Sequence, residues 1–226
     1  MANKDVFSSL YRWAYRQGEN FTTEAFVFLL NELRDRDPAI SCALLNWLCF
    51  DGVPPFCASN PPIICPWSKH TGGTPDIRIE GSNELVLVEV KKGSDLHQGQ
   101  LAAYRSILKN EISSAGNKSL VLLTAYHATF GPHEEPDVWK RWGDVEEWLG
   151  KRSSSDPVAK FLIDQFRGFL RGEGMALNRV EWQYYEGVKS LISLTDMLQQ
   201  ALRDANVPTT QTSTGWGWRG DQCRWR

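Results

Sequence analysis

Two acidic residues and a lysine stand at the ends of two short segments that have the composition of β-strands. Asp76 lies near the start of TPDIRIEG, and Glu89 and Lys91 close the segment ELVLVEVKK. Side chains alternate between the two faces of a strand, so Glu89 and Lys91 share one face. Their Cα atoms are then about 6.6 Å apart, because each residue advances a strand by about 3.3 Å. An acid and an amine at this spacing can act on the same group of a substrate.

Residues 81–83, Gly-Ser-Asn, are suited to a tight turn, so the two segments are predicted to form a β-hairpin. The hairpin brings the carboxylate of Asp76 beside that of Glu89. Two close carboxylates repel each other, and a divalent cation relieves this repulsion. Oxygen ligands without an organised set of His or Cys favour Mg²⁺ or Mn²⁺ over Zn²⁺. We therefore expect a magnesium site that also accepts manganese, with Lys91 assisting the attacking water.

Two other interpretations stay open. In the first, the aspartate caps a turn, while the glutamate and the lysine form an ordinary ion pair at a strand end. In the second, Cys57 and Cys65 of a Pro-rich loop bind zinc together with His70, although their spacing matches no common zinc template.

The surrounding sequence predicts the elements that position these residues. Apolar spacing indicates helices over 4–15, from a cap at Asn20 to about residue 36, and over 40–50. Residues 51–73 form a Pro- and Gly-rich connection that can hold a short strand. After the hairpin we expect a helix over 96–112, capped by Ser94 or Asp95, and a strand buried on both faces over 119–126. Three more helices are predicted over 138–149, 156–171 and 185–205.

The motifs TPD at 74–76 and EVK at 89–91, on two strands of a hairpin, resemble the signature of the PD-(D/E)XK nuclease superfamily. QLAAY at 100–104 is similar to the QxxxY motif of the RecB-like branch of that superfamily. The resemblance covers about residues 20–126. It implies an α/β fold with a restriction-endonuclease-like αβββαβ core, in which helices flank a mixed central sheet, and with additional C-terminal helices.

The resemblance also implies a set of metal ligands. Asp76, Glu89 and the carbonyl of Val90 would hold Mg²⁺, with Asp76, Glu89 and Lys91 as the catalytic residues. The family usually supplies a further acid from a helix that precedes the hairpin. Glu24 is the natural candidate because a largely apolar run follows it, and Glu19 is the competing choice.

Three residues are expected to serve the substrate. By the resemblance, Gln100 and Tyr104 contact the substrate or organise the site, and their spacing of four places both on one face of a helix. Lys92 is expected to contact a phosphate group.

Composition restricts the class of protein. The formal net charge of −2 provides no general attraction for polyanions, so nucleic-acid binding must rest on a local surface. Five cysteines without a CxxC pair and without a secretory signal indicate reduced thiols in the cytoplasm. No apolar run approaches the roughly 18 residues of a membrane span, so no membrane association is expected.

We expect three regions: a nuclease core with N-terminal helices over 1–135, a helical extension packed on it over 136–206, and a tail rich in Gly, Trp and Arg over 207–226. The predicted function is hydrolysis of DNA by a cytoplasmic Mg²⁺-dependent deoxyribonuclease, which could act as a homodimer. The alternative is a catalytically inactive nuclease-like module that binds nucleic acid or a protein partner. A structural or regulatory helical protein with an incidental hairpin is the third hypothesis.

Overall fold

The computed structural model describes all residues except 1–4, 15–16, 54, 71, 94–95, 111–115, 132–133, 177–181, 205–216, 220–221 and 225–226. The chain divides into two compact units, Met1–Leu177 and Asn178–Arg226. The first unit contains the sheet and the predicted site residues, and each unit is described by itself.

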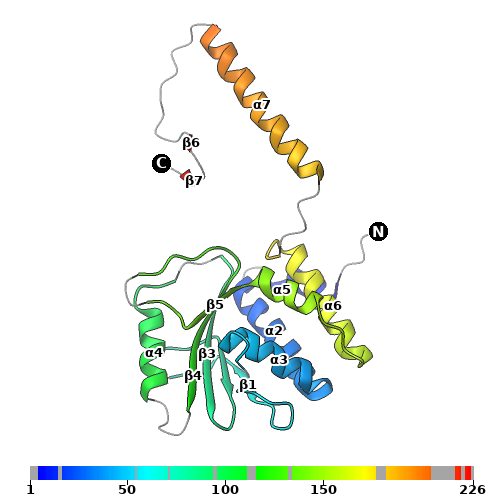
Figure 1. Cartoon of the computed structure of the whole chain (residues 1–226), viewed down its shortest axis with the longest axis vertical. Coiled ribbons are helices and arrows are strands. Elements are labelled where there is room, and N and C mark those ends of the chain that lie inside the picture. Colours follow the sequence, from blue (N-terminus) through cyan, green and yellow to red (C-terminus); the bar gives the residue numbers. More distant parts are fainter. Residues whose placement is uncertain are drawn as a thin grey trace. The chain divides into compact units, whose positions relative to one another are not determined.

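A five-stranded mixed sheet forms the centre of the first unit (Figure 1). Its strands lie in the order β1, β2, β3, β4, β5. β1 pairs antiparallel with β2, and β2 with β3, whereas β3–β4 and β4–β5 are parallel. The strands span Ile63–Pro66, Ile77–Glu80, Glu84–Lys91, Asn117–Thr124 and Val138–Arg141. The hairpin is confirmed as β2 and β3, and β1 is the short strand that the Pro-rich connection could hold.

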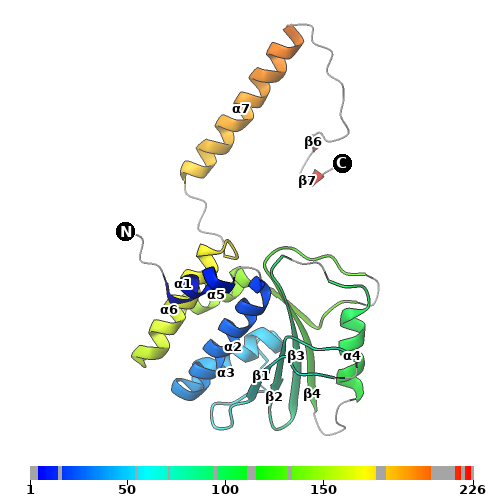
Figure 2. The same ribbon diagram turned by 180° about the vertical axis from the view of Figure 1, so that it is seen from behind.

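The two faces of the sheet contact different helices (Figures 1 and 2). Val86, Val88 and Val90 of β3 belong to the larger apolar core, which helices on the same side of the sheet complete. Leu85 and Leu87 of the same strand belong to a smaller cluster with α4, Gln100–Asn110. This alternation follows from the period of two along a strand, and we call the second side the α4 face.

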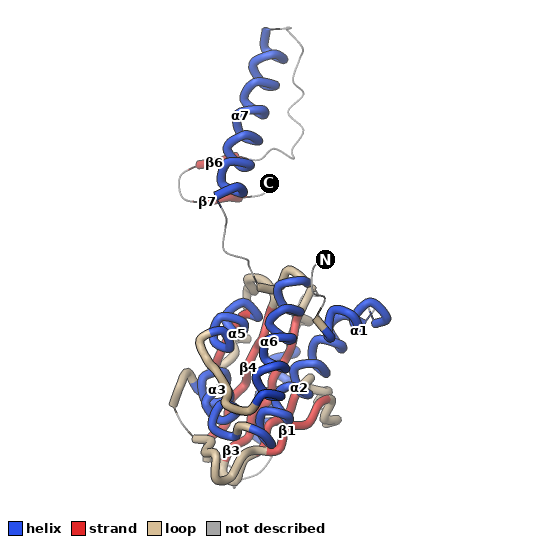
Figure 3. Tube along the Cα trace, turned by 90° about the vertical axis from the view of Figure 1, so that its right-hand side faces the viewer, coloured by secondary structure: helices blue, strands red, loops and turns tan. Residues whose placement is uncertain are grey.

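The helices of the larger core have clear start signals. α3, Pro38–Phe50, begins with a proline after Asp37, whose carboxylate accepts the N–H of Ile40. α6, Pro157–Gly172, repeats this arrangement with Asp156 as its cap. α2, Gly18–Arg36, packs against α3 and α6, and α6 also contacts α1, Val6–Ala14, and α5, Trp142–Gly150 (Figure 3).

The second unit contains α7, Trp182–Asp204, and a two-stranded antiparallel ribbon of β6, Gly217–Arg219, and β7, Gln222–Arg224. Among the helices that the structure describes, none combines the length and the apolar character needed to cross a membrane.

One prediction needs correction. Residues 138–141, expected to start a helix, form β5, because they pair in parallel with β4 at the sheet edge, and four residues carry too little periodicity to identify a strand. β5, α5 and α6 lie in the first compact unit together with the sheet and its core.

Smaller differences concern element ends. Asn20 lies inside α2 and does not cap it, and α4 starts at Gln100 in place of residue 96. The predicted caps Ser94 and Asp95, and the helix ends expected at residues 112 and 205, lie outside the described residues.

Candidate active site

Asp76 and Glu89 face each other across the β2–β3 hairpin. Ile77, the first residue of β2, pairs with Val88, so one further step along both strands sets Asp76 opposite Glu89. Ile77 and Val88 point into the larger core, and their neighbours Asp76 and Glu89 therefore project from the α4 face. Both acids are nevertheless buried, with 7% and 2% of their surface exposed. The hairpin thus places two carboxylates together away from bulk water.

The end of β2 explains how Asp76 is held. Its Oδ2 accepts a hydrogen bond of 2.7 Å from the Val90 N–H. The continued register sets Pro75 opposite Val90, and proline has no N–H to donate to the Val90 carbonyl. Since the N–H and C=O of a strand residue point the same way, this carbonyl is directed to the side on which Asp76 lies. A carboxylate and a main-chain oxygen are thereby brought together.

Lys91 lies between two acids. Its Nζ is 2.7 Å from Oε1 of Glu89 and 3.6 Å from Oε1 of Glu19, in the first turn of α2. The second oxygen of Glu19 accepts the main-chain N–H of Lys92 at 3.0 Å. Glu19 therefore connects the start of α2 to the end of β3 and adds a third acid to the cluster.

The first residue of α4 orients Glu89. Gln100 donates its side-chain N–H to Oε1 of Glu89 at 2.6 Å, while its amide oxygen accepts the N–H of His97 at 3.3 Å. The second contact determines which end of the amide faces the glutamate. Gln100 therefore organises the site through Glu89.

Tyr104 continues this contact one turn along α4. Its hydroxyl lies 3.2 Å from the Gln100 amide nitrogen and donates to the Thr74 carbonyl at 3.2 Å. Burial raises the pKa of Tyr104, which keeps the phenol protonated as a donor. Gly73 makes room for the ring, because a Cβ there would come within 2.9 Å of it. Tyr104 therefore ties α4 to the segment that leads into Asp76.

The cluster holds more negative charge than Lys91 neutralises. Burial, and then repulsion from Glu89, raises the pKa of Asp76 to about 7. Burial also raises the pKa of Glu89, against the opposing effect of Lys91 and of the hydrogen bond from Gln100. Burial by itself lowers the pKa of Lys91, but Glu89, Glu19 and Asp76 outweigh it, so the pKa lies above its ordinary value. Lys91 is therefore a cation in this arrangement.

One carboxylate oxygen of the site is buried without a hydrogen bond. Oε2 of Glu89 has no hydrogen-bond partner among the described residues, and burying an unpaired carboxylate oxygen costs free energy. A divalent cation shared with Asp76 would bind this oxygen, so the donor set of two carboxylates and the Val90 carbonyl fits a hard metal ion. In the part of the chain that the structure describes, however, no group of three or more His, Cys, Asp and Glu side chains is arranged as metal ligands.

Two predicted site residues, Glu24 and Lys92, make their contacts away from the two carboxylates. Glu24 is exposed, and its carboxylate accepts the indole N–H of Trp67 at 2.5 Å, whereas Glu19 is the α2 acid that reaches Lys91. The helix starts two residues before Asn20, which brings Glu19 into its first turn. From the sequence, Glu19 was the competing choice for this acid.

Lys92 points away from the acids. Its Nζ donates to the Tyr11 hydroxyl at 2.8 Å and to Glu173 at 3.0 Å, and lies over the Tyr11 ring. Successive residues of a strand project to opposite faces, so Lys92 meets α1 and the end of α6 while Lys91 meets the acids. In this arrangement Lys92 links α1 and the end of α6 to the end of β3, and its contact with a phosphate group stays a prediction.

Comparisons with known proteins add no assignment: no family model matches the chain, and no curated protein or solved structure was found to be similar to it.

Proposed function

We propose that this chain is a metal-dependent nuclease that hydrolyses phosphodiester bonds of DNA, with a restriction-endonuclease-like core. The observation that carries the proposal is the buried pair Asp76 and Glu89. Both pKa values are raised, and Oε2 of Glu89 lacks a partner among the described residues. Buried titratable groups with shifted pKa values occur preferentially at functional sites. Lys91, two residues past Glu89, supplies the cation such a reaction requires.

The element order supports the choice of core. α2 and α3 precede the three antiparallel strands β1, β2 and β3, and α4 then crosses to β4, which lies parallel to β3. This order is compatible with the αβββαβ core that the motif resemblance implies, with the acids on the hairpin and the glutamine and tyrosine on the next helix.

Each residue has a role in this proposal. Asp76, Glu89 and the Val90 carbonyl would hold Mg²⁺ or Mn²⁺, with Glu19 nearby. When bound, the cation supplies Lewis-acid stabilisation of negative charge on the phosphate oxygens. Lys91 positions the attacking water and stabilises charge that develops on phosphorus. Gln100 and Tyr104 hold Glu89 and the segment before Asp76 in place.

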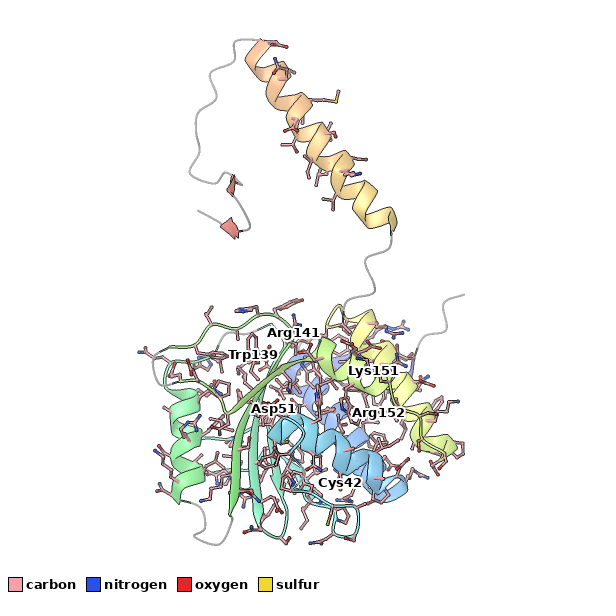
Figure 4. The ribbon with its side chains drawn as sticks, viewed as in Figure 1. Cys42, Asp51, Trp139, Arg141, Lys151 and Arg152 are labelled. Atoms are coloured by element: carbon pink, nitrogen blue, oxygen red, sulfur yellow. The ribbon has the colours of Figure 1, made fainter. Side chains whose placement is uncertain are left out.

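The direct test is cleavage of single-stranded, linear duplex and circular DNA by the purified chain with Mg²⁺ or Mn²⁺. We expect Lys91→Met to lower the rate roughly 10³-fold, since removing one group that stabilises developing charge has an effect of this size. The matched control is Lys151→Met, since Lys151 is 68% exposed and pairs with Glu147 at the end of α5 (Figure 4). Equal rates for Lys91→Met and the wild type would refute the assigned role.

A non-catalytic module that binds nucleic acid or a protein partner is the second candidate. The 2.7 Å ion pair between Lys91 and Glu89 favours it, because the lysine already neutralises one of the acids. Calorimetry with Mg²⁺ separates the two functions. Metal binding that Asp76→Ala abolishes supports the nuclease, whereas no metal binding together with no cleavage of any nucleic acid supports the module.

A further inference from the structure

Three side chains form a row across the carboxyl ends of the parallel strands. Lys91 of β3 pairs with Thr124 of β4, and Thr124 pairs with Arg141 of β5. Paired residues on adjacent strands project to the same face, so Thr124 and Arg141 share the α4 face with Lys91. Adjacent strands lie about 4.8 Å apart, which sets the Cα of Arg141 about 9.6 Å from that of Lys91. Figure 4 shows Arg141 where β5 runs into α5.

An aromatic cluster lies beside this row. The indole N–H of Trp139, two residues before Arg141, donates to the Thr124 hydroxyl oxygen at 2.9 Å. The rings of His127 and Phe130 meet Trp139 nearly at right angles, with centroids 5.0 Å and 5.5 Å away. These contacts fix the orientation of the half-buried tryptophan. His127 itself is exposed and so borders the solvent.

Tyr126 extends the aromatic surface into the solvent. It follows β4 by two residues, and its carbonyl accepts the Thr124 hydroxyl at 2.7 Å, yet 64% of its surface is exposed. Single exposed aromatic residues are common on proteins. The main chain of this one, however, is tied to Thr124, which belongs to the same row as Lys91.

Arg141 retains binding capacity. Its Nε and Nη2 contact Asp144 at 3.4 Å and 3.2 Å, and 55% of its side-chain surface is exposed. Within the described residues these contacts leave the Nη1 hydrogens for another acceptor. An exposed ion pair of this kind adds little stability, so a phosphate can recruit the guanidinium.

Two acids of the nearby loop, Glu134 and Asp137, are already engaged. Glu134 accepts the N–H of Gly99. Asp137 accepts the N–H of Leu120 at 2.8 Å and pairs with Arg105 at 2.9 Å. Their charge is therefore partly compensated, which lowers the repulsion that a phosphate would meet along this edge.

We propose that Tyr126, His127 and Arg141 form a subsite for unpaired DNA beside the active site. Arg141 binds a backbone phosphate, and the two exposed rings stack on bases that are not in a duplex, since every base presents a π-face. The span of about 9.6 Å lets one DNA strand contact Lys91 and Arg141 together. This inference rests on the proposed nuclease, and it assigns that nuclease a single-stranded segment next to the bond that is cut.

The test measures binding without cleavage. A fluorescent twelve-nucleotide oligo-dT and a blunt duplex of the same length are titrated by anisotropy with the Lys91→Met protein in Mg²⁺. We expect tighter binding of the single strand, weakened about tenfold by Tyr126→Ala. Arg141→Ala should weaken single-strand binding whatever the base sequence, because it removes a phosphate contact. It should also reduce the slope of log K against log salt by about 0.7. The matched controls are Phe161→Ala, 51% exposed on α6, and Arg152→Ala, whose guanidinium lies over Trp148.

The outcomes separate the two proposals. Duplex binding at least as tight as single-strand binding, or equal effects of the subsite and control variants, overturns the subsite. Loss of single-strand binding in Tyr126→Ala and Arg141→Ala, with no cleavage of any substrate by wild type, sustains the subsite and rejects the nuclease. If the wild type cleaves DNA and neither Tyr126→Ala nor Arg141→Ala changes the cleavage rate, the nuclease is sustained and the subsite is rejected.

Discussion

Lys91 and Lys92 are consecutive, yet they enter two regions of opposite character. On the side of α1 and α6, the charge of Lys92 is balanced by Glu173, a tyrosine hydroxyl and an aromatic ring. On the α4 side, Lys91 faces Asp76, Glu89 and Glu19, so acids outnumber the lysine. In the first region, contacts within the protein balance the charge of Lys92 and link α1 and the end of α6 to β3. The second retains an excess of buried negative charge, as expected of a site that binds a cation.

The largest effect is expected from removing one acid of that excess. Asp76→Asn keeps an oxygen that can accept the Val90 N–H but removes the charge. Because the pKa of Asp76 is raised from 3.8 to about 7 in the folded protein, the folded state holds the proton more tightly between these pH values. The stability of the metal-free wild type therefore falls as the pH rises through this interval.

We expect the metal-free Asp76→Asn variant to exceed the wild type by about 1–3 kcal/mol in free energy of unfolding at pH 8, and to match it near pH 3. Urea denaturation across this pH range measures the difference. Added Mg²⁺ should raise the melting temperature of the wild type and not that of the variant. A variant less stable than the wild type at pH 8 would contradict this prediction. It would mean that the metal-free protein already balances the negative charge of Asp76.

A smaller effect is expected on the other side of the strand. Lys92→Met removes the bonds to Tyr11 and Glu173 but keeps the main-chain N–H that Glu19 accepts. We expect a loss of about 1–2 kcal/mol in the free energy of unfolding and a cleavage rate within about threefold of wild type. A rate as low as that of Lys91→Met would show that the two regions are not separate.

The smallest effect distinguishes two acids of α2. Glu19→Gln should lower the cleavage rate about fivefold, because the carboxylate that pairs with Lys91 loses its charge. Glu24→Gln should leave the rate unchanged, since that residue contacts Trp67. Rates measured at saturating substrate compare the pair. A larger loss for Glu24→Gln would restore the original choice of ligand.

Local periodicity was sufficient for much of this molecule. The alternation of ELVLVEVK determined that Glu89 and Lys91 share a face while three valines enter the core, and the structure has this arrangement. The spacing of Gln100 and Tyr104 determined that one helix presents both. These are properties of neighbouring residues, and the geometry of a strand or a helix suffices to derive them.

Tertiary structure decided what depends on distant partners. Residues 138–141 became a strand because β4 offered a parallel edge, and β1 is a strand because it pairs with β2. The approach of Glu19 to Lys91, and the partners that Lys92 meets, follow from how α1, α2 and α6 pack against the end of β3. No local pattern contains these contacts, because they join residues more than seventy positions apart.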